Sequence, residues 1–141
     1  MAESKSASGL RSGESAGGIA RVDTIGIPSS DTARSGEFYV DTLGLRPDEH
    51  SWNEFWVGES CFSIWEPARF GGEFRPQANS IVLLHVGDVA AARSALEAKG
   101  VEFDGDTFDS GVCHMANFRD PDGNQLTLHK RYAPYGERSA A

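Results

Sequence analysis

The stretch SSDTARSGEFYVDTLGL at residues 29–45 predicts one helix with a defined start and end. Ser30 or Asp31 can cap its first turn, because a short side chain that carries oxygen accepts a hydrogen bond from a free backbone amide there. Gly44 stands where a helix ends in a left-handed residue, a conformation that glycine adopts most easily. The alternating segment ARVDTIGIP at residues 20–28 precedes the helix and predicts a β-strand.

The same order of elements occurs a second time in residues 80–101, SIVLLHVGDVAAARSALEAKGV. Asp88 is the second candidate cap, 57 residues after Asp31, and Gly100 stands 56 residues after Gly44. An internal repeat of this length indicates two copies of one structural unit, each with a strand followed by a capped helix.

Short strands are expected after each helix, because the sequence there alternates between apolar and polar residues. In the first half they are residues 53–59 and 60–67, and in the second half 101–106, 111–119 and 124–130, the last two joined by the turn DPDG. Each half therefore has the order βαβββ, and the predicted fold class is α+β. A generic ferredoxin-like sandwich would explain neither the similarly spaced caps nor the second set of strands.

The chain is expected to contain one ordered domain with a tail at each end. Residues 1–19 are rich in Ser, Gly and Ala, and this composition predicts disorder. Module one then covers residues 20–67, a linker covers 68–79 and module two covers 80–131, while residues 132–141 form a polar C-terminal tail.

Composition places the 141-residue chain among ordinary globular proteins of the cytoplasm, with 39% hydrophobic and 24% charged residues. No apolar run is long enough to span a membrane, and the N-terminal residues show no secretory signal. Cys61 and Cys113 are too few for a disulfide framework and are expected to be packed thiols. The spacings of a P-loop and a dinucleotide-binding loop are absent from the sequence. The stretch GESAGG at residues 13–18 has a serine between glycines, but it lies in the expected tail with no preceding strand and is therefore no nucleophile elbow.

The formal net charge of −8 argues against a nucleic acid partner, since an acidic domain repels phosphate and the sequence has no basic stripe. An acidic balance favours a cationic ligand, although it also serves solubility alone. Both interpretations stay open at this point.

Two motifs make the chain resemble a known family. The patterns GIPxxDxxxSxxFYxDxLGL at residues 26–45 and FRDPDGNQLTL at residues 118–128 are similar to those of the vicinal oxygen chelate superfamily. This superfamily includes glyoxalase I, extradiol dioxygenases, and fosfomycin- and bleomycin-resistance proteins. The resemblance covers residues 20–131 and implies two tandem βαβββ modules whose curved mixed sheets surround a concave pocket, with the helices outside. It does not by itself assign a reaction.

In the metal enzymes of this family, four strand residues, usually His or Glu, reach into the pocket. Carried over by motif, their positions here hold a hydroxyl or alkyl side chain in every case: Thr24, Ser63, Ile81 and Thr127. Zn²⁺ and similar ions need imidazole, thiolate or carboxylate ligands, usually three or four together. The resemblance therefore implies a protein that has lost the family metal, and we expect no metal site and no cofactor.

Strand alternation predicts which side chains line the pocket, because successive residues of a strand point to opposite faces. The predicted ligand-binding residues are Thr24, Trp56, Ser63, Trp65, Ile81, Leu83, His85, Gln125, Thr127 and His129, with Gly26 and Cys61 beside them. Such a mixture of aromatic, apolar and a few polar groups suits a planar or partly hydrophobic organic ligand. Alternatively, the two tryptophans fill the core between sheet and helix.

His85 and His129 are the candidate catalytic residues, since both are expected to point the same way on adjacent strands. Two imidazoles can act as acid and base near neutral pH, bind a metal weakly, or stand at the strand ends with neither role. Glu66 becomes a further candidate ligand if the register of its strand shifts by one residue, which would turn Trp65 under the helix.

These observations predict a ligand-binding protein of the glyoxalase/bleomycin-resistance type. It would sequester a small organic molecule, aromatic or cationic, and act as a homodimer, as the resemblance implies. The competing prediction is an enzyme of the same superfamily, a lyase, isomerase or dioxygenase, that uses His85 and His129 or non-standard metal ligands. No membrane or nucleic acid partner is expected.

Overall fold

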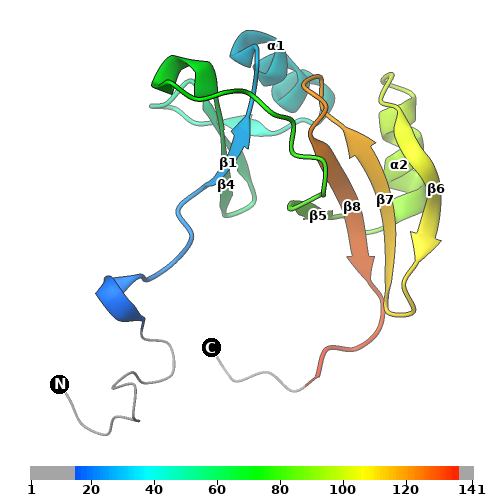
Figure 1. Cartoon of the computed structure of the whole chain (residues 1–141). Helices are drawn as coiled ribbons and strands as arrows, with labels where there is room; N and C mark the ends of the chain where they lie inside the picture. Colours follow the sequence, from blue (N-terminus) through cyan, green and yellow to red (C-terminus); the bar gives the residue numbers. More distant parts are fainter. Residues whose placement is uncertain (1–14, 137–141) are drawn as a thin grey trace, which may run out of the picture.

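The two halves of the chain form two copies of one unit, as the repeat predicts. The computed structural model describes residues 15–136 and contains two four-stranded sheets, with a helical layer against each (Figure 1). The first unit contains β1 (Ile25–Pro28), α1 (Thr32–Glu37), the π-helical turn η2 (Phe38–Thr42), β2 (Arg46–Pro47), β3 (Glu54–Val57) and β4 (Ser60–Trp65). The short 3₁₀ turn η3 (Pro67–Phe70) follows. The second unit contains β5 (Leu83–His85), α2 (Val89–Glu97), β6 (Phe103–Asp109), β7 (Cys113–Arg119) and β8 (Gln125–Arg131).

Both sheets have the same mixed topology. The strand order is β1-β4-β3-β2 in the first sheet and β5-β8-β7-β6 in the second, with the first and last strands of each module paired in parallel. The remaining pairs are antiparallel. This topology confirms the α+β class and the βαβββ order. β2 contains only two residues, too few for alternation to reveal, and Pro47 suits its edge position because it lacks an amide hydrogen.

The capping residues confirm the predicted starts and ends of the helical segments. The carboxylates of Asp31 and Asp88 each accept a hydrogen bond from the backbone N–H three residues later, at 3.1 Å and 2.9 Å. Gly44 and Gly100 have φ angles of 74° and 92°, which lie in the left-handed region. The sequence repeat therefore reflects a repeat of local structure.

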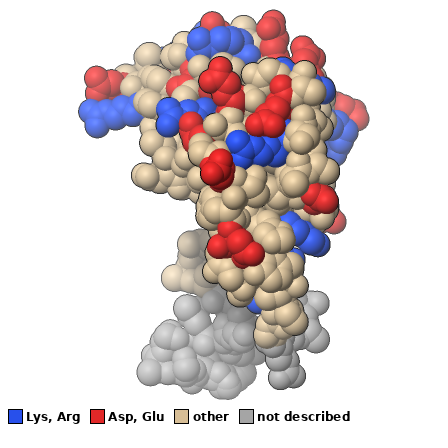
Figure 2. Space-filling view, turned by 90° about the vertical axis from the view of Figure 1, so that its right-hand side faces the viewer, with Lys and Arg blue, Asp and Glu red and all other residues tan. Residues whose placement is uncertain are grey.

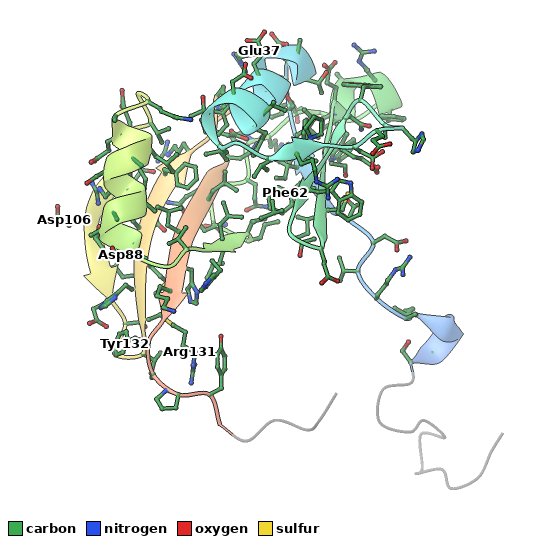
Figure 3. The ribbon with its side chains drawn as sticks, turned by 180° about the vertical axis from the view of Figure 1, so that it is seen from behind. Glu37, Phe62, Asp88, Asp106, Arg131 and Tyr132 are labelled. Carbon is green, nitrogen blue, oxygen red and sulfur yellow. The ribbon has the colours of Figure 1, made fainter. Side chains whose placement is uncertain are left out.

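One hydrophobic core runs through both modules. Its buried side chains come from the strands and helical segments of each half, as Figure 3 illustrates for Phe62. The buried members are Ile27, Tyr39, Phe55, Phe62 and Ile64 in the first module, and Val82, Val89, Val101, Ala116, Phe118, Leu126 and Leu128 in the second. Cys61 and Cys113 are buried free thiols, as expected.

The turn between β7 and β8 fastens the second module to the first. The buried Asp122 carboxylate accepts hydrogen bonds from Ser29 Oγ at 2.6 Å and from Ser30 N at 2.9 Å. Ser35 Oγ donates to the same carboxylate, and Arg34 Nη2 pairs with it at 2.7 Å. Burial alone would raise the pKa of this carboxyl group, but the serine hydrogen bonds lower the pKa to about 2. Asp122 is therefore an ionised, buried anchor at neutral pH.

Two further side chains of this turn reach into module one. Tyr39 Oη donates a hydrogen bond to Asp120 Oδ2 at 2.7 Å, and both residues are buried. Asn124 Nδ2 donates to the Pro28 carbonyl oxygen at 2.8 Å. Burial, followed by the charge of Asp120, raises the pKa of the Tyr39 hydroxyl, which keeps it protonated as a donor. The turn thus joins the two modules as well as the two strands.

The expected tails fall mostly outside the described residues, which exclude 1–14 and 137–141. Composition predicts disorder through residue 19, but in the described part Ala16–Gly18 form a short 3₁₀ turn that buries no residue. No helix within residues 15–136 is long and apolar enough to cross a membrane.

Candidate functional site

Each sheet has one side against the core and one side that points away from the helices. Even-numbered residues of β4 and β8, such as Phe62, Ile64, Leu126 and Leu128, are in the core, so the odd-numbered residues point away from it. We call this second side the helix-free face. Its residues are Thr24, Gly26, Trp56, Cys61, Ser63 and Trp65 in module one, and Ile81, Leu83, His85, Met115, Asn117, Gln125, Thr127 and His129 in module two.

Trp65 is the main exposed aromatic side chain of the helix-free face and stands at the end of β4. Its side chain lies against Gly26, where an added Cβ would come within 3.4 Å of the indole nitrogen. The indole is 40% exposed and has Phe70 as a neighbour, with ring centroids 6.1 Å apart. Trp65 is therefore outside the core and available to stack on a ligand.

Trp56 lies at the β2 edge of the same sheet, in a separate acidic hollow. Its indole nitrogen donates a hydrogen bond to Asp48 Oδ1 at 2.8 Å, and the Arg46 guanidinium carbon stands 5.9 Å from the ring centroid. The hydrogen bond from Trp56 lowers the pKa of the Asp48 carboxyl. A cavity of about 560 Å³ surrounds this group and is also lined by Glu49, His50, Gly58 and Glu59.

The predicted residues of module two come from two paired strands. In the parallel register of β5 and β8, Leu83 is the partner of Thr127 and His85 is the partner of His129. Ile81 and Leu83 are 59% and 49% exposed, which is high for large apolar side chains. Together they give this half of the helix-free face an apolar surface with two imidazoles at its end.

The side chains at the four family metal positions are uncharged and either form hydrogen bonds with other uncharged side chains or are apolar. Thr24 Oγ1 donates a hydrogen bond to Ser63 Oγ at 3.1 Å. Thr127 Oγ1 donates to Asn117 Oδ1 at 2.7 Å, and Ile81 supplies only an alkyl group. Within the described residues, His, Cys, Asp and Glu form no group of three or more that could hold a metal ion. These donors do not fit the family metal.

Glu66 is not a candidate ligand on the helix-free face, because it lies beyond β4 at the start of α1. Its carboxylate accepts hydrogen bonds from Thr32 N at 3.0 Å and Thr32 Oγ1 at 2.9 Å. Arg69 Nε donates at 2.7 Å, and this bond contributes most to lowering the pKa of Glu66 to about 2. The shift in register that would have brought Glu66 into the pocket does not occur, since Ser63 is the partner of Gly26.

Within the described residues, a small cleft brings together predicted pocket residues of both modules. Gly26 of module one and Ile81 and Gln125 of module two line this cleft, together with Gln77 and Asn124. Its volume of about 40 Å³ is close to that of one water molecule and far below the usual size of an organic-ligand pocket. Within one protomer, therefore, this cleft is too small to hold the predicted organic ligand.

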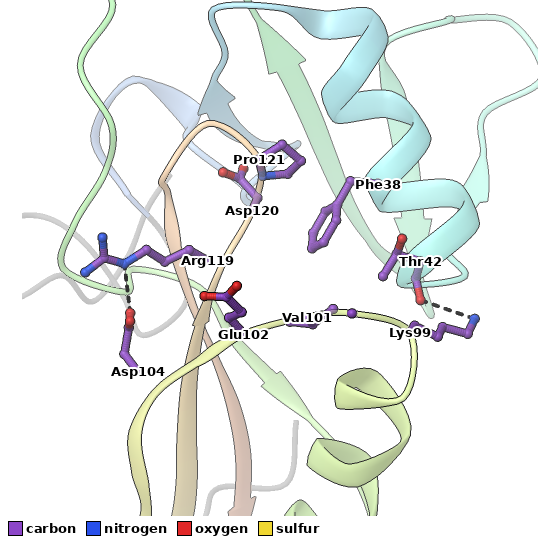
Figure 4. Close-up of a pocket in the computed structure, with 10 residues that line it drawn as sticks. Phe38, Thr42, Lys99, Val101, Glu102, Asp104, Arg119, Asp120 and Pro121 are labelled. Carbon is purple, nitrogen blue, oxygen red and sulfur yellow. Dashed lines mark hydrogen bonds and ion pairs between the residues drawn. The ribbon is translucent and has the colours of Figure 1, made fainter.

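A groove that sequence reasoning missed crosses the module junction on another side of the molecule (Figure 4). Its volume is about 440 Å³, and Phe38 and Val101 form its apolar part. Arg119 Nε pairs with Asp104 Oδ2 at 2.8 Å, while Lys99 Nζ lies 3.4 Å from the Thr42 carbonyl oxygen. No sequence motif marks such a groove, because it exists only where the modules meet.

The surface charges do not gather into a basic patch on the side seen in Figure 2, where Lys and Arg side chains are interspersed with Asp and Glu. This mixed distribution gives a phosphate backbone no continuous track on that side.

A family model described as Glyoxalase/Bleomycin resistance protein/Dioxygenase superfamily matches residues 21–128. Among solved structures, the chain is similar to TnmS3, an antibiotic binding protein from Streptomyces sp. CB03234, with 26% identity over 80% of this chain and 97% of that chain and a TM-score of 0.65. A member of the superfamily from Sphaerobacter thermophilus DSM 20745 is 25% identical over 79% of this chain and 97% of that chain, with a TM-score of 0.67. No curated protein matches.

Proposed function

Because the chain belongs to the glyoxalase/bleomycin resistance protein/dioxygenase superfamily, we propose that it binds and sequesters a small organic molecule without using the family metal. The observation that carries this proposal is the helix-free face, where Trp65, Ile81 and Leu83 stay exposed although they are large and apolar. Such a surface with a few oriented polar groups is typical of a small-molecule site. The similarity to an antibiotic binding protein supports the same class of function.

The ligand that we propose is planar, aromatic and cationic. Trp65 offers an open indole face, which attracts flat rings and cations. The net charge of −8 raises the local concentration of cations and favours their binding. The same negative net charge would repel an anionic ligand.

We further propose that a second copy of the chain completes the pocket. On the helix-free face, the described residues of one protomer leave Ile81 and Leu83 exposed and form a cleft of only about 40 Å³ between the modules. A partner that covers Ile81 and Leu83 would bury their apolar surface and enclose a guest between the two copies.

The Trp65→Ala variant tests the stacking surface. We expect isothermal titration calorimetry to show that proflavine, a planar cation, binds more tightly than uncharged phenazine or anionic anthraquinone-2-sulfonate. Trp65→Ala should raise the proflavine Kd about tenfold, the usual value of one aromatic stack. Trp52→Ala is the matched control, because Trp52 is 71% exposed outside the strands and should leave Kd unchanged. Equal losses in both variants, or tightest binding of the sulfonate, would contradict the proposal.

Removal of divalent metal tests the second part of the proposal. After dialysis against EDTA, we expect the proflavine Kd to change by less than about twofold, since the side chains at the four family positions are not metal donors. Added Zn²⁺ or Ni²⁺ should leave it unchanged as well. A large loss of affinity that either ion restores would show that the family metal is needed after all.

A further inference from the structure

Three adjacent strands place two imidazoles and a thioether in one row on the helix-free face. His85 on β5 is the register partner of His129 on β8, and His129 is in turn the partner of Met115 on β7. The three strands lie side by side in the second sheet (Figure 1). Paired strands are about 4.8 Å apart, so the side chains that flank His129 can converge above it. We propose that His85, His129 and Met115 form a binding site for Cu(I).

The imidazoles of these two histidines differ from that of His114 in having no side-chain partner among the described residues. His114 Nε2 pairs with Asp109 at 3.5 Å and stacks on Tyr132, and it lies on the core side of β7. By contrast, the imidazole of neither His85 nor His129 has a hydrogen bond or ion pair within the described residues 15–136, although the His129 carbonyl oxygen accepts a backbone hydrogen bond from Val86 N at 3.1 Å. Their ring nitrogens therefore remain available as ligands. His85 is exposed and His129 is partly exposed, so an ion can reach them.

The donor set selects copper among the common metal ions. Imidazole binds late first-row ions in general, whereas a thioether is a soft ligand that favours Cu(I). No carboxylate stands in the row, which removes the hard donor that Mg²⁺, Ca²⁺ and Mn²⁺ require. Zn²⁺ would find only two good ligands here and should bind more weakly than Cu(I).

The surroundings of the row are compatible with a cation. Arg131 follows His129 by two residues, but its guanidinium donates to the carbonyl oxygens of Ala133 and Pro134 at 2.9 Å and 2.7 Å. The Arg131 side chain, seen near the end of β8 in Figure 3, is thus bound to the segment beyond the strand. The net charge of −8 also favours a bound cation.

This site is distinct from the family metal positions and does not rest on the proposed organic ligand. His85 is four residues after Ile81, and His129 is two residues after Thr127. A Cu(I) site here would be an exception to the sequence-based prediction of no metal site, which rests on the side chains at those four family positions. Cu(I) binding can therefore succeed or fail independently of proflavine binding.

Competition with bicinchoninate under anaerobic, reducing conditions tests the site on the full chain. We expect the wild-type protein to withdraw one Cu(I) ion per chain from the chelator. His129→Asn should weaken Cu(I) binding about a hundredfold, and Met115→Leu, which keeps the size of the side chain, about tenfold. X-ray absorption should show one sulfur neighbour of copper in the wild type and none in the Met115→Leu variant.

Two sets of controls make the outcome decisive. His114→Asn, on the opposite side of the sheet, should leave Cu(I) affinity unchanged. The double variant Cys61→Ser with Cys113→Ser should also leave it unchanged, which would exclude the two thiols as Cu(I) ligands. Met115→Leu should not alter the weaker Zn²⁺ affinity, since zinc does not favour thioethers. The proposal would be overturned if folded His129→Asn protein bound Cu(I) as tightly as the wild type. It would also be overturned if the folded double cysteine variant lost Cu(I) binding.

Discussion

Replacing Asp122 by Asn should lower the free energy of unfolding by about 3 kcal/mol. The carboxylate receives hydrogen bonds from Ser29, Ser30 and Ser35 and an ion pair from Arg34, all at the start of module one. An amide of the same size presents only one acceptor oxygen and turns donor hydrogens toward the remaining donors. Urea unfolding followed by circular dichroism measures the loss.

Asp104→Asn is the matched control for this prediction. Asp104 also pairs with an arginine, but both partners are largely exposed, so the change should cost less than about 1 kcal/mol. Equal losses in the two variants would show that burial gives Asp122 no special role in joining the modules.

The stabilising effect of Asp122 should disappear in acid. Its pKa in the folded protein is lowered from 3.8 to about 2, so the folded state binds this proton less readily than the unfolded state. The contribution is therefore complete above about pH 4 and is lost as the pH falls toward 2. The difference in unfolding free energy between wild type and Asp122→Asn should shrink over that range. A constant difference down to pH 2 would contradict the lowered pKa.

Leu83→Glu should convert the proposed dimer into a monomer. Leu83 is 49% exposed on the helix-free face, where we propose that a second copy packs. A carboxylate buried there without a partner should raise the dimer dissociation constant about a hundredfold or more. Sedimentation velocity over a range of concentrations measures the change. Proflavine affinity should fall in parallel, because the second copy completes the pocket.

Val112→Glu provides the comparison for the dimer prediction. Val112 is exposed to a similar extent but lies in the turn between β6 and β7, outside the helix-free face. It should leave the sedimentation of the protein unchanged. If the wild-type chain sediments as a monomer while it binds proflavine, a second copy is not needed to complete the pocket. If Leu83→Glu remains a dimer, the helix-free face is not the dimer interface.

Local signals were sufficient to predict most of the fold. Asp31, Asp88, Gly44 and Gly100 act through contacts within a few residues, so their roles are visible in a short stretch of sequence. Alternation along β8 likewise separates buried Leu126 from the opposite side of the sheet because a strand repeats every two residues.

Contacts between distant segments were beyond the reach of the same reasoning. Ser29 and Asp122 form a hydrogen bond although they are 93 residues apart in the sequence, and no local pattern specifies that pair. Glu66 was a candidate ligand only under a different register, and its binding to Thr32 depends on how β4 lies beside α1. The roles of the predicted ligand-binding residues stay predictions, since the direction of a side chain alone does not identify the ligand that it binds.

The Asp122 junction also affects how the protein is made. Ribosomes synthesise a chain from its N-terminus, and early segments commonly fold before later ones emerge. Ser29 and Ser35 are nearly fully buried, yet the carboxylate that receives their hydrogen bonds is synthesised late, within module two. The nascent first half thus lacks its polar counterpart until the turn between β7 and β8 has left the ribosome, so the first half completes its buried hydrogen bonds only after most of module two has been synthesised.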